Sequence, residues 1–379
     1  MGAAGYGSTC GSVIQTAWGT TGTITNRVPI FKESLTETIK QLENEALVGL
    51  AGQDMLDADV RSIAGAIETD LRYTQEVTPV ATPYWCGSDL WLSLAMGGAP
   101  AYNSSINTLF LAESPSKYAT IVFDKQGTYW EFGSCAFKGF KLAFKSADVL
   151  RVTFDVLARS LLRTGTTNGA AQIAALAARG GKRAKFGDPM VFRLNAITDG
   201  ALDAGDAFGF NELTLEYDAA ISEPEHCSPD YNVAVGSGTH GDNTTTHSAL
   251  LTLPFVRNGK RKVEMSFSAP RYMADTLLDW RDAETELQMD VCSSIDAGAR
   301  TFRLLCPRLK VTECSAPIEG AALMGVKGKM TLLYNGGTSS GSGANAVMTN
   351  SVPSTNKIPE EFQIELKNSA DGRTAAIWT

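Results

Sequence analysis

The chain has 379 residues, enough for two or three domains of average size and for a substantial buried core. Hydrophobic residues make up 44% and charged residues 20% of it, and no run approaches the ~18 uninterrupted apolar residues of a transmembrane helix. A net charge of -8, with no basic tract longer than Arg179 to Lys185, argues against tight binding of phosphates. The seven cysteines are odd in number and lack CxxC spacing, which favours reduced thiols.

Composition divides the chain into five segments. The 36 glycines, the frequent Ser and Thr and the short apolar runs favour strands and turns over long helices. An Ala-rich stretch ended by Gly180 and Gly181 predicts a short helix within a linker, and the alternation of EFQIELKNS predicts a last strand at 361–368. The predicted segments are an N-terminal arm (1–26), a first strand-rich domain (27–163), a linker (164–187), a second strand-rich domain (188–335) and a flexible segment with a terminal strand (336–379).

The two strand-rich domains repeat the same order of elements. Ile63, Gly65 and Ile67 alternate with polar residues in the first, as Val263, Met265 and Phe267 do in the second, which predicts strands with one buried face. Each is followed by a predicted helix, at 83–98 and 274–283. A hairpin then follows at 136–162 and at 306–333, and FKESLTETIK (31–40) corresponds to FNELTLEYDA (210–219).

Side-chain type gives a residue-level alignment of the two hairpins. It places Phe140 on Leu309 and, after one extra residue in the turn, Phe154 on Met324. The common order predicts an internal duplication, with chance similarity between amphipathic strands as the alternative.

Two glycine-rich strings match catalytic or nucleotide-binding motifs without the required context. GSGTHG (236–241) matches the dinucleotide pattern, but DNTTTH follows it instead of a helix. GTSSG (337–341) matches a nucleophile elbow, but it lies in a flexible segment rather than between a strand and a helix. We therefore predict that both are loops.

Neither a metal site nor a catalytic centre is predicted. His226, Cys227, His240 and His247 cluster in sequence, but they lack the paired spacing of zinc ligands. The acidic residues show no spacing typical of a paired acid and base. The sequence predicts no enzyme activity, no catalytic residue, no bound metal and no cofactor.

The first third of the chain resembles the tail tube, or major tail, proteins of long-tailed bacteriophages. A Gly/Ala/Ser-rich arm precedes Ala17-Trp18-Gly19-Thr20-Thr21-Gly22-Thr23, and Pro29 starts a Pro-x-x-x-Glu-Ser-Leu step. A Gly65-Ala66-Ile67-Glu68 strand and a helix ending in Leu94-Ala95-Met96-Gly97-Gly98 follow in the family's order. The resemblance covers about residues 5–160 directly and the second domain through the repeat. The acidic segment AGQDMLDADV (51–60) departs from the family pattern.

The resemblance implies a mainly β fold with two tandem tube-type β-sandwich or half-barrel domains, each with one short flanking helix. Each domain of this kind contributes about four strands to a shared barrel, so six domains supply about 24 strands. At ~4.8 Å per strand and a tilt of ~40°, such a barrel has a circumference of roughly 150 Å and an open bore of roughly 35 to 40 Å, wide enough for duplex DNA. Two domains per chain therefore favour trimeric rings over hexamers.

The implied function is a structural subunit that assembles into stacked rings around an acidic conduit for DNA ejection. The implied partners are further copies of the chain, a tape-measure protein, a tail terminator and distal tail proteins, with DNA passing through unbound and no membrane involved. The implied location is the virion tail, after assembly in the host cytoplasm. The candidate lumen-facing residues are Glu37, Glu68, Asp70, Glu264, Ser266 and Ser268, and the candidate contacts between rings are Trp18, Asp54, Asp57, Asp59, Phe362 and Ile364.

A virion-associated β-rich module that binds carbohydrate or a host surface is the alternative. A module of that kind stays monomeric and retains glycans, whereas a tube subunit forms rings or filaments.

Overall fold

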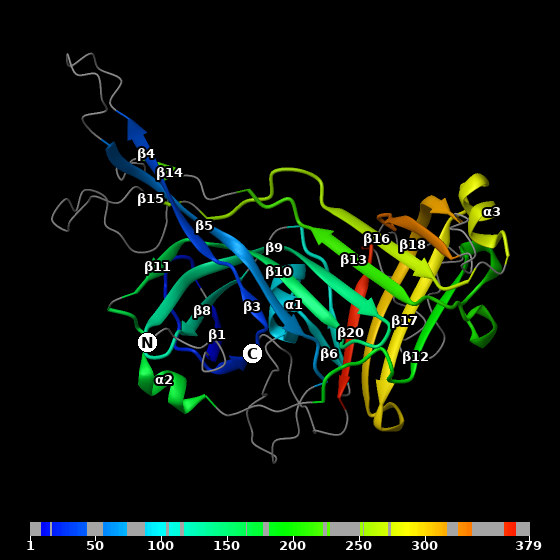
Figure 1. Cartoon of the computed structure of the whole chain (residues 1–379), viewed down its shortest axis with the longest axis horizontal. Coiled ribbons are helices and arrows are strands. Elements are labelled where there is room, and N and C mark those ends of the chain that lie inside the picture. The colour runs from blue at the N-terminus through cyan, green and yellow to red at the C-terminus, as the bar shows by residue number, and fades with distance from the viewer. Residues whose placement is uncertain are drawn as a thin grey trace.

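The computed structural model is dominated by strands, and it confirms the prediction of a mainly β protein. Figure 1 shows the strands as one broad array, with β4 and β5 reaching beyond the others at one end and β18 and helix α3 at the other. The described residues are 9–15, 17–43, 56–73, 88–103, 106–113, 117–163, 165–176, 182–222, 226–227, 251–252, 254–271, 274–316, 325–335 and 360–368.

Eight strand positions form one continuous antiparallel sheet, which we call the long sheet. At one end β3 and β4 run in line and share the partner β5, and at the other end β18 pairs with β19. The order across the long sheet is β3 with β4 (Lys32–Glu33 and Thr36–Glu43), β5 (Leu56–Asp70), β10 (Arg151–Ala158), β9 (Tyr129–Lys145), β13 (Glu212–Asp218), β16 (Lys262–Ala269), β19 (Val326–Leu332) and β18 (Arg300–Ser315). The first half of the chain thus supplies the first four positions and the second half supplies the last four.

Strands β9 and β18 also pair outside the long sheet, through their N-terminal parts. Those parts carry a second set of strands that packs over the long sheet. Around β9 the set is β8 (Tyr118–Asp124), β1 (Thr9–Gln15), β2 (Asn26–Val28) and β11 (Ser160–Leu162); around β18 it is β17 (Leu287–Ile295), β12 (Met190–Ala196), β20 (Gln363–Asn368), β7 (Ile106–Leu109) and β6 (Ala101–Asn103). A separate two-stranded pair joins β14 (His226–Cys227) to β15 (Leu251–Thr252).

Each of the two long strands carries a β-bulge where it passes into the long sheet. The register of β9 against β10 shifts at Lys138, and that of β18 against β19 shifts at Thr312. A bulge adds an unpaired residue and bends its strand, which lets one strand serve two layers.

Helix α1 (Ser88–Met96) lies between the two layers and confirms the helix predicted at 83–98. The ring of Trp91 lies 5.9 Å from that of Phe137 and 5.6 Å from that of Phe154, both on the long sheet. Its Nε1 donates to Ser12 Oγ on β1 at 3.0 Å, so one side chain joins both layers.

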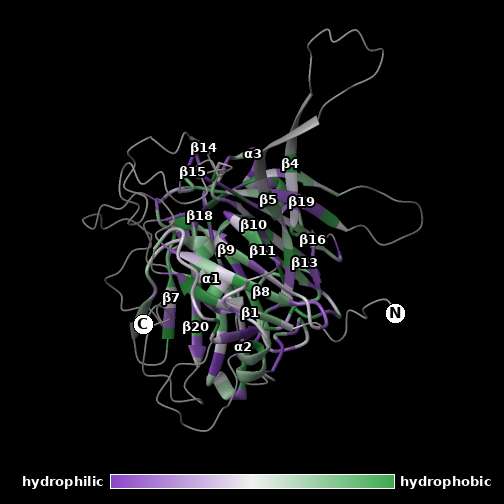
Figure 2. Cartoon of the chain, turned by 90° about the vertical axis from the view of Figure 1, so that its left-hand side faces the viewer, coloured by the Kyte–Doolittle hydropathy of each residue, from purple (hydrophilic) through white to green (hydrophobic). Residues whose placement is uncertain are grey.

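Two other helices were also predicted from the sequence and are present, although both are shorter than the stretches predicted. They are α2 (Ala170–Ala175) and α3 (Thr276–Asp282). Short 3-10 segments complete the helical part at Ile197–Asp199, Ala204–Asp206 and Asp296–Gly298. Figure 2 shows hydrophilic and hydrophobic residues interspersed along the strands, as expected when one face of each strand meets the core.

The two halves of the chain share one order of strands. In the first half β1, β8, β9, β10, β5 and β4 pair in that sequence, and in the second β12, β17, β18, β19, β16 and β13 do so. Helix α1 follows β5 as α3 follows β16. The domain boundaries at 27–163 and 188–335 remain a prediction, because β9 pairs with β13 and one core cluster spans both halves.

The register corrects the residue-level alignment of the two hairpins. Aligning the two bulges makes Lys138 equivalent to Thr312, and therefore Phe140 equivalent to Cys314. Phe154, the partner of Phe140 on β10, is then equivalent to Gly328. The shift is 174 positions in both strands, with no extra residue in the turn. The alignment by side-chain type was wrong by four to five residues, because amphipathic strands resemble each other in several registers.

The prediction of a strand near the C-terminus is confirmed by β20. It lies between β18 and β7, so it joins a strand of the second half to one of the first. Phe362, just before it, and Ile364 within it are fully buried.

Candidate assembly surface

One face of the long sheet is turned away from the core, and we call it the open face. Direct cross-strand neighbours share a face. Pairing therefore places Glu68, Thr153 and Lys141 in one row, which continues through Glu216 and Glu264.

The candidate lumen residues Glu68, Glu264, Ser266 and Ser268 all lie on this open face. On β16 the last three are solvent-accessible, whereas Val263, Met265 and Phe267, which alternate with them, are buried. Whether the open face lines a channel stays a prediction.

The two other candidate lumen residues differ from these four, because Glu37 lies on the opposite face and Asp70 is covered on the open face. Glu37 pairs with Ile63, a core residue, so it lies on the face of the sheet opposite to Glu68, and its carboxylate lies 3.6 Å from Arg163. The side chain of Asp70 is only 1% exposed because Arg72 and Arg183 cover it, at 2.8 and 2.9 Å. Neither residue presents a free carboxylate on the open face.

The open face carries charges of both signs, in contrast to the acidic face expected from the sequence. Glu68 accepts from Arg151 at 2.6 Å, Lys262 pairs with Glu264 at 2.8 Å, and Lys141 pairs with Glu216 across the β9–β13 junction. The acidic side chains are Glu68, Asp70, Asp155, Glu212, Glu216, Asp218, Glu264 and Glu313, and the basic ones are Lys32, Lys138, Lys141, Lys145, Arg151, Lys262, Lys310, Lys327 and Lys329.

The middle of the open face is hollowed where the two halves of the chain meet. Residues of β5, β10, β9, β13 and β16 line this hollow. Desolvation by these strands raises the pKa of Asp155 above its usual value; Lys138 opposes this shift, and Asp218 and Glu216 add to it. The hollow therefore holds several carboxylates close to lysines rather than a basic patch.

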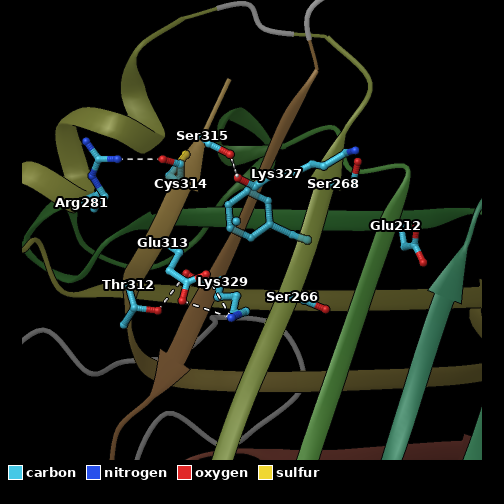
Figure 3. Close-up of a pocket in the computed structure, with 12 residues that line it drawn as sticks. Glu212, Ser266, Ser268, Arg281, Thr312, Glu313, Cys314, Ser315, Lys327 and Lys329 are labelled. Atoms are coloured by element: carbon cyan, nitrogen blue, oxygen red, sulfur yellow. Dashed lines mark hydrogen bonds and ion pairs between the residues drawn. The ribbon is translucent and has the colours of Figure 1, made fainter. Parts of the chain in front are cut away.

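A second hollow lies at the β18 end of the long sheet, and Figure 3 shows the side chains around it. Arg281 of α3 points toward the last residues of β18, where its Nη1 donates to the Cys314 carbonyl at 2.7 Å. Lys329 of β19 donates to Glu313 at 3.1 Å. Burial raises the pKa of the Cys314 thiol above its usual value, so that thiol is a weak nucleophile at neutral pH.

The other end of the long sheet is the edge formed by β3 and β4. No strand among the described residues pairs with the outer side of β4. On this edge the Leu35 N–H donates to Glu33 Oε2 at 3.2 Å. Thus each end of the sheet has a backbone group bonded to a charged side chain, a common way to protect a sheet edge.

The candidate contacts between rings are either buried in the chain or outside the described side chains. Trp18 is 9% exposed and packs edge-on against Tyr118 and Phe255, while Phe362 and Ile364 are fully buried. These three side chains are part of the chain's own core, which differs from the surface role expected of them. Asp54 lies outside the described residues, as do the side chains of Asp57 and Asp59.

The candidate chemical motifs lie outside the part that the structure describes. The GSGTHG and GTSSG strings, His240 and His247 fall there, and His226 and Cys227 are placed only as backbone. Among the described residues, no cluster of three or more His, Cys, Asp or Glu side chains could hold a metal ion. No helix in the described part is long and apolar enough to cross a membrane.

Sequence reasoning missed the two ends of the long sheet. Arg281 lies in a predicted helix, but nothing in its neighbourhood signals that it reaches a strand 33 residues further along the chain. The duplication was the available signal. If the two similar halves pair edge to edge within the chain, their outer edges can pair in the same way with the halves of other chains.

Two antiparallel layers, a helix between them and a long sheet built from two similar halves define a β-sandwich protein. The sequence profile of the phage tail tube protein family matches residues 5–355, nearly the whole chain. The chain therefore belongs to the phage tail tube protein family. Among curated proteins, no match to the chain is found.

Proposed function

We propose that three copies of this chain close into a ring and that stacked rings form the tube of a phage tail, with the open face of the long sheet lining the conduit for DNA. The observation that carries this proposal is the long sheet itself. It has eight strand positions, four from each half, and ends in two edges that other copies can extend.

The strand count supports three chains per ring. Three sheets of this size supply about 24 strands, and the resulting barrel has a backbone diameter of roughly 48 Å. Side chains reduce this to an open bore of roughly 35 to 40 Å, which admits a ~20 Å duplex. One or two copies give too few strands for such a bore.

Ion pairs on the open face limit the affinity that its basic side chains can add for DNA. Each phosphate that a protein neutralises adds affinity for DNA. On the open face, Arg151, Lys141 and Lys262 are already paired with carboxylates. The lining that we propose is therefore mixed in charge rather than acidic throughout, with part of its basic side chains held in ion pairs with neighbouring carboxylates.

The partners follow from this role. We propose that the chain contacts other copies of itself within and between rings, and a tape-measure protein, a tail terminator and distal tail proteins in the tail. We further propose that it is assembled in the host cytoplasm, that it resides in the virion, and that it has a structural rather than a catalytic role.

Negative-stain electron microscopy of the purified chain tests this function. We expect annular particles or hollow rods whose class averages contain three chains and show pseudo-sixfold symmetry. Mass photometry of the same sample should give a species of three chains, about 121 kDa from the chain mass of 40.4 kDa. A chain that stays monomeric and retains glycans would contradict the proposal and favour the alternative binding module.

A further inference from the structure

We infer that the junction between β9 and β13 inside the chain is repeated between chains, where β18 of one copy pairs with β3 and β4 of the next and Ser315 lies opposite Thr36 of the neighbouring copy. This inference rests on the proposed ring. It adds the two strands that meet, their direction and their register.

The junction inside the chain sets the geometry. Strands β9 and β13 are antiparallel, with Lys141 opposite Glu216. The Ala219 N–H donates to the Lys138 carbonyl at 2.8 Å, and the Ser146 N–H donates to the Asn211 carbonyl at 2.9 Å. Hydrogen-bonded pairs alternate with non-hydrogen-bonded pairs along an antiparallel ladder, so Lys141 and Glu216 form a non-hydrogen-bonded pair.

The duplication transfers this geometry to the ends of the long sheet. With the bulges aligned, Ser315 of β18 is the counterpart of Lys141 of β9. On the other side of the junction, Val263 of the second half is the counterpart of Ile63 of the first. Val263 pairs with Tyr217 and Ile63 pairs with Glu37, so Tyr217 corresponds to Glu37. Glu216 of β13 therefore corresponds to Thr36 of β4. Even a loop contact recurs, because the Phe31 N–H donates to Glu68 O at 2.8 Å and the Asn211 N–H donates to Ser268 O at 2.9 Å. Ser315 opposite Thr36 of the neighbouring copy is therefore the counterpart of the Lys141–Glu216 pair.

Side-chain exposure at the β4 end agrees with a missing neighbour. Ile39 is 37% exposed, whereas its counterpart Ala219, next to β9, is 3% exposed. An aliphatic side chain on a sheet edge gains from burial against another strand. In the proposed junction, Ile39 of the neighbouring copy lies opposite Thr312.

The two backbone groups capped by charged side chains are those that this junction would use. The counterpart of the Cys314 carbonyl is that of Phe140, which faces Tyr217 in a hydrogen-bonded pair of the internal junction. The counterpart of the Leu35 N–H is that of Leu215, which faces Leu142. Arg281 thus occupies a carbonyl acceptor of one free edge, and Glu33 occupies an N–H donor of the other, until a neighbouring strand arrives.

The two junctions differ at one position. Gly139 has no room for a side chain, because an added Cβ would lie 2.1 Å from Tyr217 O. Its counterpart on β18 is Glu313, so the backbone of the second junction is spaced differently there. The test is therefore placed two residues further along, at Ser315.

Engineered disulfides test the register. We expect the double variant S315C/T36C to form covalent dimers and trimers of the full chain under mild oxidation, which a reductant reverses. Non-hydrogen-bonded pairs bring Cα atoms to ~4.5 Å, within the range of a disulfide. Within one chain the two positions lie seven strand spacings apart, about 34 Å along the sheet, so only a bond between chains can form.

The matched controls keep Ser315→Cys and move the partner. S315C/S34C and S315C/T38C place the second thiol two residues away on the same exposed side of the β3–β4 edge, where diagonal neighbours lie ~7–8 Å apart. We expect both to give less than a tenth of the crosslinked product of S315C/T36C. The single variants S315C and T36C report any reaction with the native Cys314.

Electron microscopy of every variant separates the inference from the proposed function. Rings with crosslinks only in S315C/T36C support both. Rings in which a control pair crosslinks instead, or in which no pair does, overturn the register and leave the ring intact as the function. Absence of rings in the parent chain and in all variants overturns the proposed function and the inference with it.

Discussion

At the scale of single residues, the most consequential polar group is the buried carboxylate of Asp290. It is fully buried on β17 and lies 2.9 Å from both Arg193 of β12 and Arg303 of β18. Arg303 in turn lies 3.9 Å from Glu365 of β20. Four strands of the second layer are therefore joined by one charge network, and removal of a member leaves buried charge behind.

Replacement of Asp290 by Asn tests that network. We expect D290N to lower the free energy of unfolding by about 3–5 kcal/mol, because two guanidinium groups lose their common partner in a site with little water. Urea denaturation followed by tryptophan fluorescence measures the change. D282N is the control, because its carboxylate is 67% exposed and its ion pair with Arg281 is worth about 0–1 kcal/mol. Equal effects of the two substitutions would show that the network does not stabilise the fold.

At the scale of elements, the junction of β9 with β13 decides how the two halves fit together. Its strands approach so closely at Gly139 that only glycine fits, since an added Cβ would meet the backbone oxygen of Tyr217. Backbone cannot yield as the end of a long side chain can. A strand 78 residues further along the chain therefore requires this glycine, and the local backbone conformation of β9 does not.

Replacement of Gly139 by Ala should open this junction. We expect G139A to lose about 1–3 kcal/mol of stability, the usual cost of overpacking, and to lower the yield of rings. G209A is the control, because an added Cβ there meets nothing within 4 Å. Thermal denaturation and microscopy of both variants measure the two effects. A stable G139A that assembles normally would contradict the close approach.

At the scale of the whole molecule, the last described strand holds the two halves together. β20 pairs with β18 on one side and β7 on the other. The ring centroid of the buried Phe362 lies 6.1 Å from that of Phe140 and 5.7 Å from that of Tyr217. The last described strand thus lies between two strands that precede it in the sequence. Stability of the second layer depends on a segment that follows nearly all of the other elements.

Two C-terminal truncations test this dependence. We expect a chain that ends at residue 359 to aggregate, because it exposes edges of β18 and β7 and leaves the space of Phe362 empty. A chain that ends at residue 368 retains β20 and should elute and melt as the full chain does. Size-exclusion chromatography distinguishes the two. Normal behaviour of the shorter chain would show that β20 is dispensable.

The sequence alone determined the features that depend on near neighbours in the chain. Period-2 alternation located β5, β16 and β20, and Pro and Gly signals located α1, because local backbone preference and one-sided burial act within a few residues. The order of short motifs from Trp18 to Gly98 also indicated the family. These signals need no knowledge of which strand lies beside which.

Only the tertiary structure decided which strands meet and in which register. The bulges at Lys138 and Thr312 moved the hairpin alignment by four to five residues, and the pairing of Glu37 with Ile63 turned that carboxylate away from the open face. Likewise, Arg281 reaches the Cys314 carbonyl only because α3 packs beside the end of β18. Alternation is unchanged by a slip of two residues, so the pattern leaves several registers nearly equal, and distant packing selects among them.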